Sequence, residues 1–200
     1  MLNLIPDLKG GVHEQVMKTC FKVFFEMTDT MVCHRLIGHM LARRIGGLTF
    51  RIGRRSATLK PIDVSMILQL PLHDGFLVGR KSSQRTKGPT FQERMFPGVR
   101  VSKITVKIIK EKFDNKKLKV NDRARLALLY CIAVFLLPRP GDVVDGKFWA
   151  MMDESNLATF DAYPWARDVY NALWNGVSNA YEDREERKDR YNLFGCGAVL

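Results

Sequence analysis

Apolar residues recur at intervals of three and four along most of the chain, and this spacing predicts a mainly helical fold. The pattern is clearest at residues 12–27, 31–44, 103–113, 121–137 and 163–180. Gly46 and Gly47 end the second of these helices, and Ser102 can cap the third. Shorter helices are expected at residues 61–71, because Pro61 suits a first turn, and at residues 148–152.

Residues 48–59 follow a different pattern, in which apolar and polar residues alternate among β-forming residues. This alternation predicts a small β-hairpin. A chain of 200 residues usually forms one domain. We therefore expect a single, mainly α, compact helical domain over residues 1–200, with a small β-hairpin near residues 48–59. The apolar end at residues 194–200 predicts that the domain is truncated there.

The most apolar run covers residues 126–137. A membrane span needs about 20 apolar residues, so this run predicts a buried core helix and no membrane partner. Pro138 and Pro140 end it. The aromatic residues gather further along the chain and predict a core that anchors a helix pair, with a peptide-binding groove as the less favoured alternative. They are Phe148, Trp149, Phe160, Tyr163, Trp165, Tyr170 and Trp174.

The charge is unevenly distributed. The chain carries 32 Lys and Arg against 21 Asp and Glu, a formal net charge of +11. Residues 80–119 alone hold 13 basic and 3 acidic side chains, whereas residues 121–200 are slightly acidic. Residues 72–100 are rich in turn formers and predict a flexible basic loop within the domain.

The basic segment predicts contact with a nucleic acid or an acidic partner, because lysines along a helix can follow a phosphate backbone. The alternative is a solvated helix face beside a basic loop. No aromatic ladder interleaves with the lysines, so stacking on single-stranded bases is not supported. The candidate contact residues are Arg80, Lys81, Arg85, Lys87, Lys103, Lys107, Lys110, Lys116, Lys117 and Lys119. Lys103, Lys107 and Lys110 are expected on one helix face.

The sequence gives little support for metal binding, thiol catalysis or a phosphate-binding loop. The potential metal ligands Cys20, Cys33, His34 and His39 lack zinc-finger spacing, so buried thiols and surface histidines are the better interpretation. Cys131 lies in the most apolar helix, and Cys196 lies between glycines without a supporting motif. No phosphate-binding glycine motif occurs, and the acidic residues Asp142, Asp145, Asp153, Glu154 and Asp161 are interpreted as loop and cap residues. We predict no catalytic, metal or cofactor-binding residue, no cofactor, no small-molecule substrate and no enzymatic activity.

The amino-terminal residues show no secretory signal, and no cysteines form a C-x-x-C pair. These features predict an intracellular protein with reduced thiols. Basic clusters at residues 51–55 and 116–119 are of the kind that direct nuclear import, which extends the prediction to the nucleus.

Several short strings resemble a plant mobile-element family. A hairpin string leads to a helix that ends in Leu-Pro, with an Asp-Gly turn beyond it: Thr49-Phe50-Arg51-Ile52-Gly53, residues 59–71 and Asp74-Gly75. Later strings keep the same order: Leu126-Ala127-Leu128-Leu129-Tyr130, Phe160-Asp161-Ala162-Tyr163-Pro164-Trp165 and Tyr191-Asn192-Leu193-Phe194-Gly195-Cys196. Together, over roughly residues 15–200, they resemble the plant domain of unknown function numbered nineteen eighty-five. The aminotransferase-like plant mobile domain is the close runner-up.

The resemblance implies a transposon-derived domain of a kind often found beside SUMO-protease-like domains. The chain departs from both families at Gln69 and Ala166, where a glycine is usual. The matching strings are scaffold positions, so the resemblance assigns no catalytic residue. The leading hypothesis is a non-catalytic plant domain that binds protein or nucleic acid. The alternatives are an accessory part of a SUMO-protease-like cysteine peptidase polyprotein and a decayed transposon product.

Overall fold

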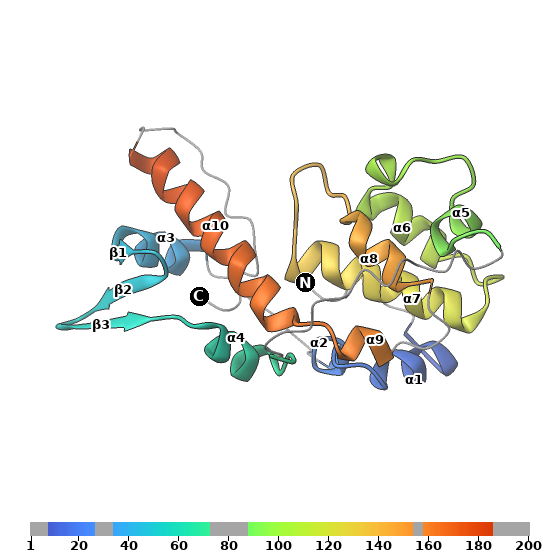
Figure 1. Cartoon of the computed structure of the whole chain (residues 1–200), viewed down its shortest axis with the longest axis horizontal. Helices are drawn as coiled ribbons and strands as arrows, with labels where there is room; N and C mark the ends of the chain where they lie inside the picture. Colours follow the sequence, from blue (N-terminus) through green and yellow to red (C-terminus); the bar gives the residue numbers. More distant parts are fainter. Residues whose placement is uncertain (1–7, 27–33, 73–87, 154–157, 186–200) are drawn as a thin grey trace.

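The computed structural model of the chain describes residues 8–26, 34–72, 88–153 and 158–185. Within these ranges helices form the body of the molecule, and a three-stranded antiparallel sheet projects from one end (Figure 1). The expected mainly α fold with a small β-hairpin is confirmed. The helix predicted to be most buried lies in the body, and the long C-terminal helix reaches from the body to the sheet.

The helix expected at residues 12–27 is divided in two, α1 (Gly11–Met17) and α2 (Lys22–Glu26). The prediction was wrong at the break because two side chains compete for backbone groups there. The Thr19 hydroxyl donates to the carbonyl of Val16 at 2.7 Å. The backbone N–H of Cys20 donates to the Asp161 carboxylate at 2.6 Å, and this partner is 141 residues away in the sequence.

The next helix, α3 (His34–Ala42), ends before the expected Arg44. Arg44 instead begins β1 (Arg44–Gly46), a strand beyond the two of the predicted hairpin. It pairs with β2 (Thr49–Ile52). The predicted hairpin is β2 paired with β3 (Arg55–Thr58). Gly53 has a φ of 62° at the first central position of the two-residue turn, where a type II′ hairpin favours glycine.

The predicted helix after the hairpin is α4 (Pro61–Leu68), in which Asp63 caps the backbone N–H of Lys60. The stretch expected to be a flexible loop at residues 72–100 contains a helix, α5 (Phe91–Met95). Thr90 and Glu93 form a reciprocal capping box at its start, a short signal that the basic composition concealed. The remainder of that loop prediction, residues 73–87, lies outside the described residues.

The helix expected at residues 103–113 begins later, as α6 (Val106–Phe113), and Ser102 does not cap it. Thr105 is held extended by a β-bridge to Val143, and the N–H of Val106 donates to the carbonyl of Asp142 at 2.7 Å. The residues before this bridge form a separate 3-10 turn, η1 (Val101–Lys103). A partner some forty residues further along the chain therefore decides where α6 starts.

The most apolar helix is confirmed as the centre of the core. It consists of α7 (Val120–Cys131) and a continuing π-helical segment, η2 (Ile132–Leu136), which closes with a bond from the N–H of Leu137 to the carbonyl of Ile132. Every residue from 126 to 133 is buried. The last helices are α8 (Gly146–Met151), α9 (Ala158–Asp161) and α10 (Trp165–Glu185), and the last of these is longer than expected.

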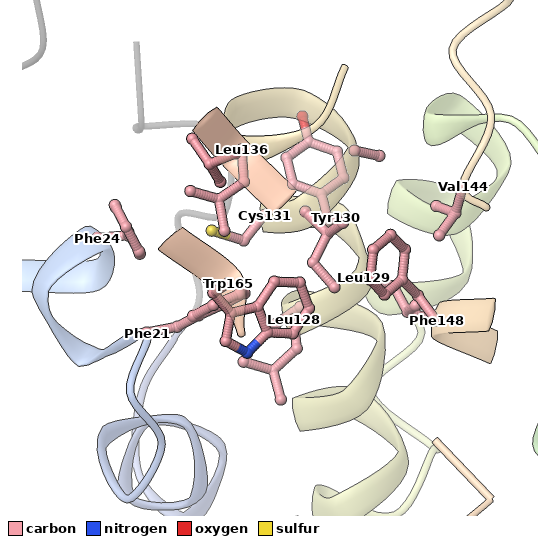
Figure 2. Packing of buried hydrophobic residues seen from close by; sticks show 14 of the residues in the cluster. Phe21, Phe24, Leu128, Leu129, Tyr130, Cys131, Leu136, Val144, Phe148 and Trp165 are labelled. Carbon is pink, nitrogen blue, oxygen red and sulfur yellow. The ribbon is translucent and has the colours of Figure 1, made fainter. Parts of the chain in front are cut away.

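Aromatic rings join the N-terminal helices to α10. The Trp165 ring lies 4.8 Å from that of Phe21 and stacks on Phe148 at 5.3 Å, and Leu128 and Cys131 of α7 are part of the same cluster (Figure 2). The indole N–H of Trp165 donates to the carbonyl of Phe160 at 2.6 Å. The predicted aromatic core is thereby confirmed for its buried members. Trp174 is the exception, with 41% of its surface exposed.

Candidate nucleic-acid interface

The predicted contact residues fall into two groups. Arg80, Lys81, Arg85 and Lys87 lie outside the described residues. The others lie within residues 103–119, here called the basic segment. This segment runs from η1 through α6 and the following turn to the start of α7.

The lysines before and within α6 do not share one helix. Lys103 belongs to the 3-10 turn, whereas Lys107 and Lys110 are three residues apart on α6, so the expected single face of three lysines is wrong. Ile109 and Phe113 hold α6 against the body and are 0% and 2% exposed. Their burial turns Lys107 to solvent and leaves Lys110 half-buried.

The turn after α6 presents three more lysines. The Asn115 side chain accepts from the N–H of Lys117 at 3.0 Å, and the Asn115 carbonyl accepts from the N–H of Leu118 at 3.2 Å. Leu118 is half-buried against the core. This contact anchors the turn to the body of the molecule. Lys116, Lys117 and Lys119 are exposed around it.

Two neighbouring cations are already engaged with the fold. The Arg123 guanidinium lies 4.8 Å from the Phe113 ring, and its Nε donates to the carbonyl of the same residue at 3.1 Å. The Lys112 ammonium lies 5.8 Å from the Phe96 ring. In contrast, no ion pair within the described part of the chain involves Lys103, Lys107, Lys117 or Lys119.

A shallow pocket of about 390 Å³ adjoins the end of the basic segment, at the start of α7. Three cationic side chains line it: Lys119, which is a predicted contact residue, and Arg94 and Arg125, which are not. Arg94 comes from α5 and pairs with Asp122 at 3.6 Å. Burial lowers the pKa of the Arg125 guanidinium, and Arg94 acts in the same direction, while Asp122 opposes both. The capping box of α5 was the sequence signal that could have placed Arg94 on a helix.

The pocket is mixed in charge, because the carboxylates of Asp122 and Asp153 also line it. Asp153 accepts a hydrogen bond from the N–H of Phe91 and so holds the start of α5 beside the end of α8. The carboxylates therefore organise the pocket, and the exposed lysines beside it carry the excess positive charge. Such a surface suits phosphate groups more than bases, because Phe91, Phe96 and Phe113 are all buried.

A second cluster of polar side chains stabilises the packing of α8 against α10. Lys147 lies 2.5 Å from the Asp168 carboxylate and donates to the Tyr163 hydroxyl at 2.7 Å, and that hydroxyl donates to Asp168. The cluster joins α8 to the first turn of α10. Burial, followed by the hydrogen bond to Asp168, raises the pKa of Tyr163, so the phenol remains protonated.

Metal and thiol chemistry gain no candidates from the described ranges. No group of three or more metal-binding side chains occurs in the described residues. Cys131 is buried, and burial raises the pKa of the Cys20 thiol, with the Asp161 carboxylate acting in the same direction. The other two cysteines, Cys33 and Cys196, lie outside the described residues.

Three of the carboxylates interpreted as loop and cap residues accept hydrogen bonds from backbone N–H groups, and Glu154 lies outside the described residues. Asp145 caps α8 by accepting from the N–H of Lys147 at 3.0 Å, as predicted. Asp153 and Asp161 accept from distant backbone N–H groups, which the sequence alone could not indicate. Among the helices described, none combines the length and the apolar character that crossing a membrane requires.

Comparison with curated proteins and with solved structures finds no match to the chain. The resemblance to the plant domain numbered nineteen eighty-five is not addressed by these comparisons and stays a prediction. A family model does match, over residues 1–200, and its description is Domain of unknown function (DUF8566). The chain, helical around a single aromatic core and carrying a basic segment beside α7, belongs to this family.

Proposed function

We propose that this domain is a non-catalytic binding module whose basic segment contacts the phosphate backbone of a nucleic acid. The observation that carries the proposal is the state of the lysines in residues 103–119. Lys103, Lys107, Lys117 and Lys119 are exposed and form no ion pair within the described ranges. Each is available to a phosphate without first breaking a contact of the fold.

The anchoring of the segment supports the same function. Ile104, Ile109 and Phe113 are buried, so the backbone that carries the lysines is held by the core. A pre-positioned set of cations loses less conformational entropy on binding than cations on a free chain. Without exposed aromatic residues among the lysines, the expected contact is with the backbone and is independent of base sequence.

The first testable prediction concerns salt dependence. We expect a fluorescent 20-base-pair DNA duplex to bind the full chain more weakly as the salt concentration rises. Replacing two exposed lysines in Lys107→Gln/Lys117→Gln removes two phosphate contacts, so the slope of log K against log salt should become shallower by about two. Fluorescence anisotropy at several salt concentrations measures both the affinity and the slope.

The matched control is Arg51→Gln/Arg55→Gln, which removes the same charge from the exposed hairpin. This variant should retain the slope of the unchanged protein. If both variants lose affinity equally, the duplex responds only to net charge and the assigned surface is wrong. Absence of binding at 50 mM salt, the low end at which such contacts are strongest, would also refute the proposal.

A further inference from the structure

The β-hairpin forms a second surface, distinct from the basic segment. Residues 43–60, here called the hairpin arm, project from the body at the end opposite α5 and α6 (Figure 1). The arm is firmly rooted. The Arg44 side chain donates to the Gly47 carbonyl at 2.6 Å and to the Ser178 hydroxyl of α10 at 3.0 Å, and it lies 4.9 Å from the Tyr181 ring.

The outer strand of the arm has an open edge. Among the described strands the sheet order is β1-β2-β3, so within this part of the chain β3 has a neighbour on one side only. The N–H of Leu59 donates to the carbonyl of Leu48, and the register pairs Phe50 with Ala57. Because hydrogen-bonded and non-hydrogen-bonded pairs alternate in antiparallel strands, the backbone groups of Ser56 and Thr58 point away from β2. These groups can therefore pair with an added strand.

The side chains of the arm separate into two faces. Cross-strand partners share a face, so Ile52, Arg55 and Ala57 lie on the face of Phe50, and Arg51 lies with Ser56 and Thr58 on the other. Phe50 is 3% exposed at the root, whereas Ile52 is 55% exposed near the tip. The apolar face therefore continues beyond the part that the body covers.

Exposed apolar side chains also occur on α4, the helix that follows the arm. Only Leu59 and Lys60 separate β3 from α4. On this helix Ile62 and Met66, one turn apart, are 48% and 65% exposed, while Val64 and Leu68 are buried in the core. A strand that extends along β3 can thus meet apolar side chains on both elements.

The charge of the arm determines which strand fits. Residues 43–60 contain six basic side chains and no acidic one. Arg51, Arg54 and Arg55 are exposed. An added strand with acidic side chains gains charge complementarity, and a basic strand, including the β3 edge of a second copy of this chain, is repelled.

We propose that the open edge of β3 binds an extended peptide of another protein, in which acidic and apolar residues alternate. Backbone pairing at Ser56 and Thr58 supplies the attachment, as in strand addition to a sheet edge. The acidic side chains lie on the face that carries Arg51, and the apolar ones contact the face of Ile52 and Ala57. This inference is independent of nucleic-acid binding by the basic segment.

The second testable prediction uses a defined probe, a blocked eight-residue peptide that alternates glutamate and valine. In NMR titrations of the full chain the amide signals of Ser56 and Thr58 should shift with this peptide. A peptide of lysine and valine, and one of glutamate and serine, should bind at least about tenfold more weakly, because each lacks one of the two contacts. The same glutamate–valine peptide with every backbone nitrogen methylated should not bind, because neither of its edges can then pair with β3.

Protein variants test the edge itself. Ser56→Pro removes an outward N–H while leaving the β2 ladder intact, so it should weaken binding about tenfold or more. Its matched control, Ser56→Ala, keeps the N–H and should bind normally. Arg51→Gln/Arg55→Gln should weaken binding, and Lys107→Gln/Lys117→Gln should not. The methylated peptide maintains the test even if Ser56→Pro disturbs the hairpin.

Several results would overturn the inference. One is full binding of the methylated peptide, because strand addition needs the backbone groups. Another is self-association through β3 without peptide binding, which would assign the edge to a second copy. A third is loss of DNA duplex binding in Arg51→Gln/Arg55→Gln together with no response to the peptide, which would assign the arm to nucleic acid. No shift at Ser56 and Thr58 would indicate that the arginines only protect the edge from aggregation.

Discussion

At the scale of single residues, long-range polar contacts determine how several side chains behave. Asp161 holds the N–H of Cys20, and Asp153 holds that of Phe91. In each case the residue type alone indicates only a carboxylate near a helix end. Tyr163 shows the consequence for titration most clearly, because its hydroxyl is buried between α8 and α10 and donates to Asp168.

The third prediction follows from the raised pKa of Tyr163. The folded protein keeps the phenol protonated where the unfolded chain ionises, at a pKa of about 10. The stability that this group contributes is therefore complete below pH 10 and is lost as the pH rises above it. One such group changes the free energy of unfolding by at most about 1.4 kcal/mol per pH unit.

Urea unfolding between pH 9 and 11.5 measures this effect. The free energy of unfolding of Tyr163→Phe should fall less steeply with pH than that of the unchanged protein. Tyr181→Phe, a tyrosine outside the cluster with Lys147 and Asp168, is the control and should follow the unchanged protein. Parallel pH profiles for all three proteins would contradict the assignment.

At the scale of elements, the turn between β1 and β2 packs closely against a side chain of α10. Gly47 has a φ of 52°, and a Cβ built there would lie 2.3 Å from the Trp174 ring. The glycine thus satisfies a backbone requirement and a close approach at once. This contact, with the Arg44 hydrogen bonds, sets how the hairpin arm leaves the body.

The fourth prediction is that Gly47→Ala destabilises the protein by about 1–2 kcal/mol from the left-handed backbone alone. The displaced Trp174 ring adds to this cost and should shift its fluorescence. In a Trp174→Ala background the cost of Gly47→Ala should be smaller, because only the backbone part remains. Urea midpoints for the four proteins form the cycle. An equal cost in both backgrounds would exclude the steric contact.

At the scale of the whole molecule, one hydrophobic cluster includes buried residues from Val12 to Ala180. The N-terminal helices, α7 and α10 all contribute to it, and the rings of Phe21 and Trp165 meet within it (Figure 2). A shared core predicts that distant elements unfold together. The two proposed surfaces lie outside this core, so they can be altered without removing it.

The fifth prediction tests this cooperativity with Leu128→Ala in α7. The residue is 0% exposed, so the variant should lose about 2–5 kcal/mol of stability. Far-UV circular dichroism and tryptophan fluorescence should report one common urea midpoint before and after the change. Lys117→Ala, on the exposed turn, should leave the midpoint nearly unchanged. Separate midpoints for the two probes would show that the elements unfold independently.

The helical class, the position of the hairpin and the buried helix around residues 126–137 all follow from the sequence alone. These features depend on local periodicity, turn residues and the sheer density of apolar side chains, all of which act between near neighbours. The sequence also shows where the excess positive charge lies, because charge is a property of composition. Even the missed helix α5 had a local signal in its capping box.

The positions at which helices break, and the polar groups that meet, depend on contacts that exist only in the folded chain. The turn at Cys20 depends on Asp161, the start of α6 on Asp142 and Val143, and the strand at Arg44 on Ser178 and Gly47. Ile62 and Met66 are exposed because Val64 and Leu68 occupy the core instead. A periodic pattern specifies a face, but the partner that covers it comes from distant parts of the chain, and its position is set only when the core closes.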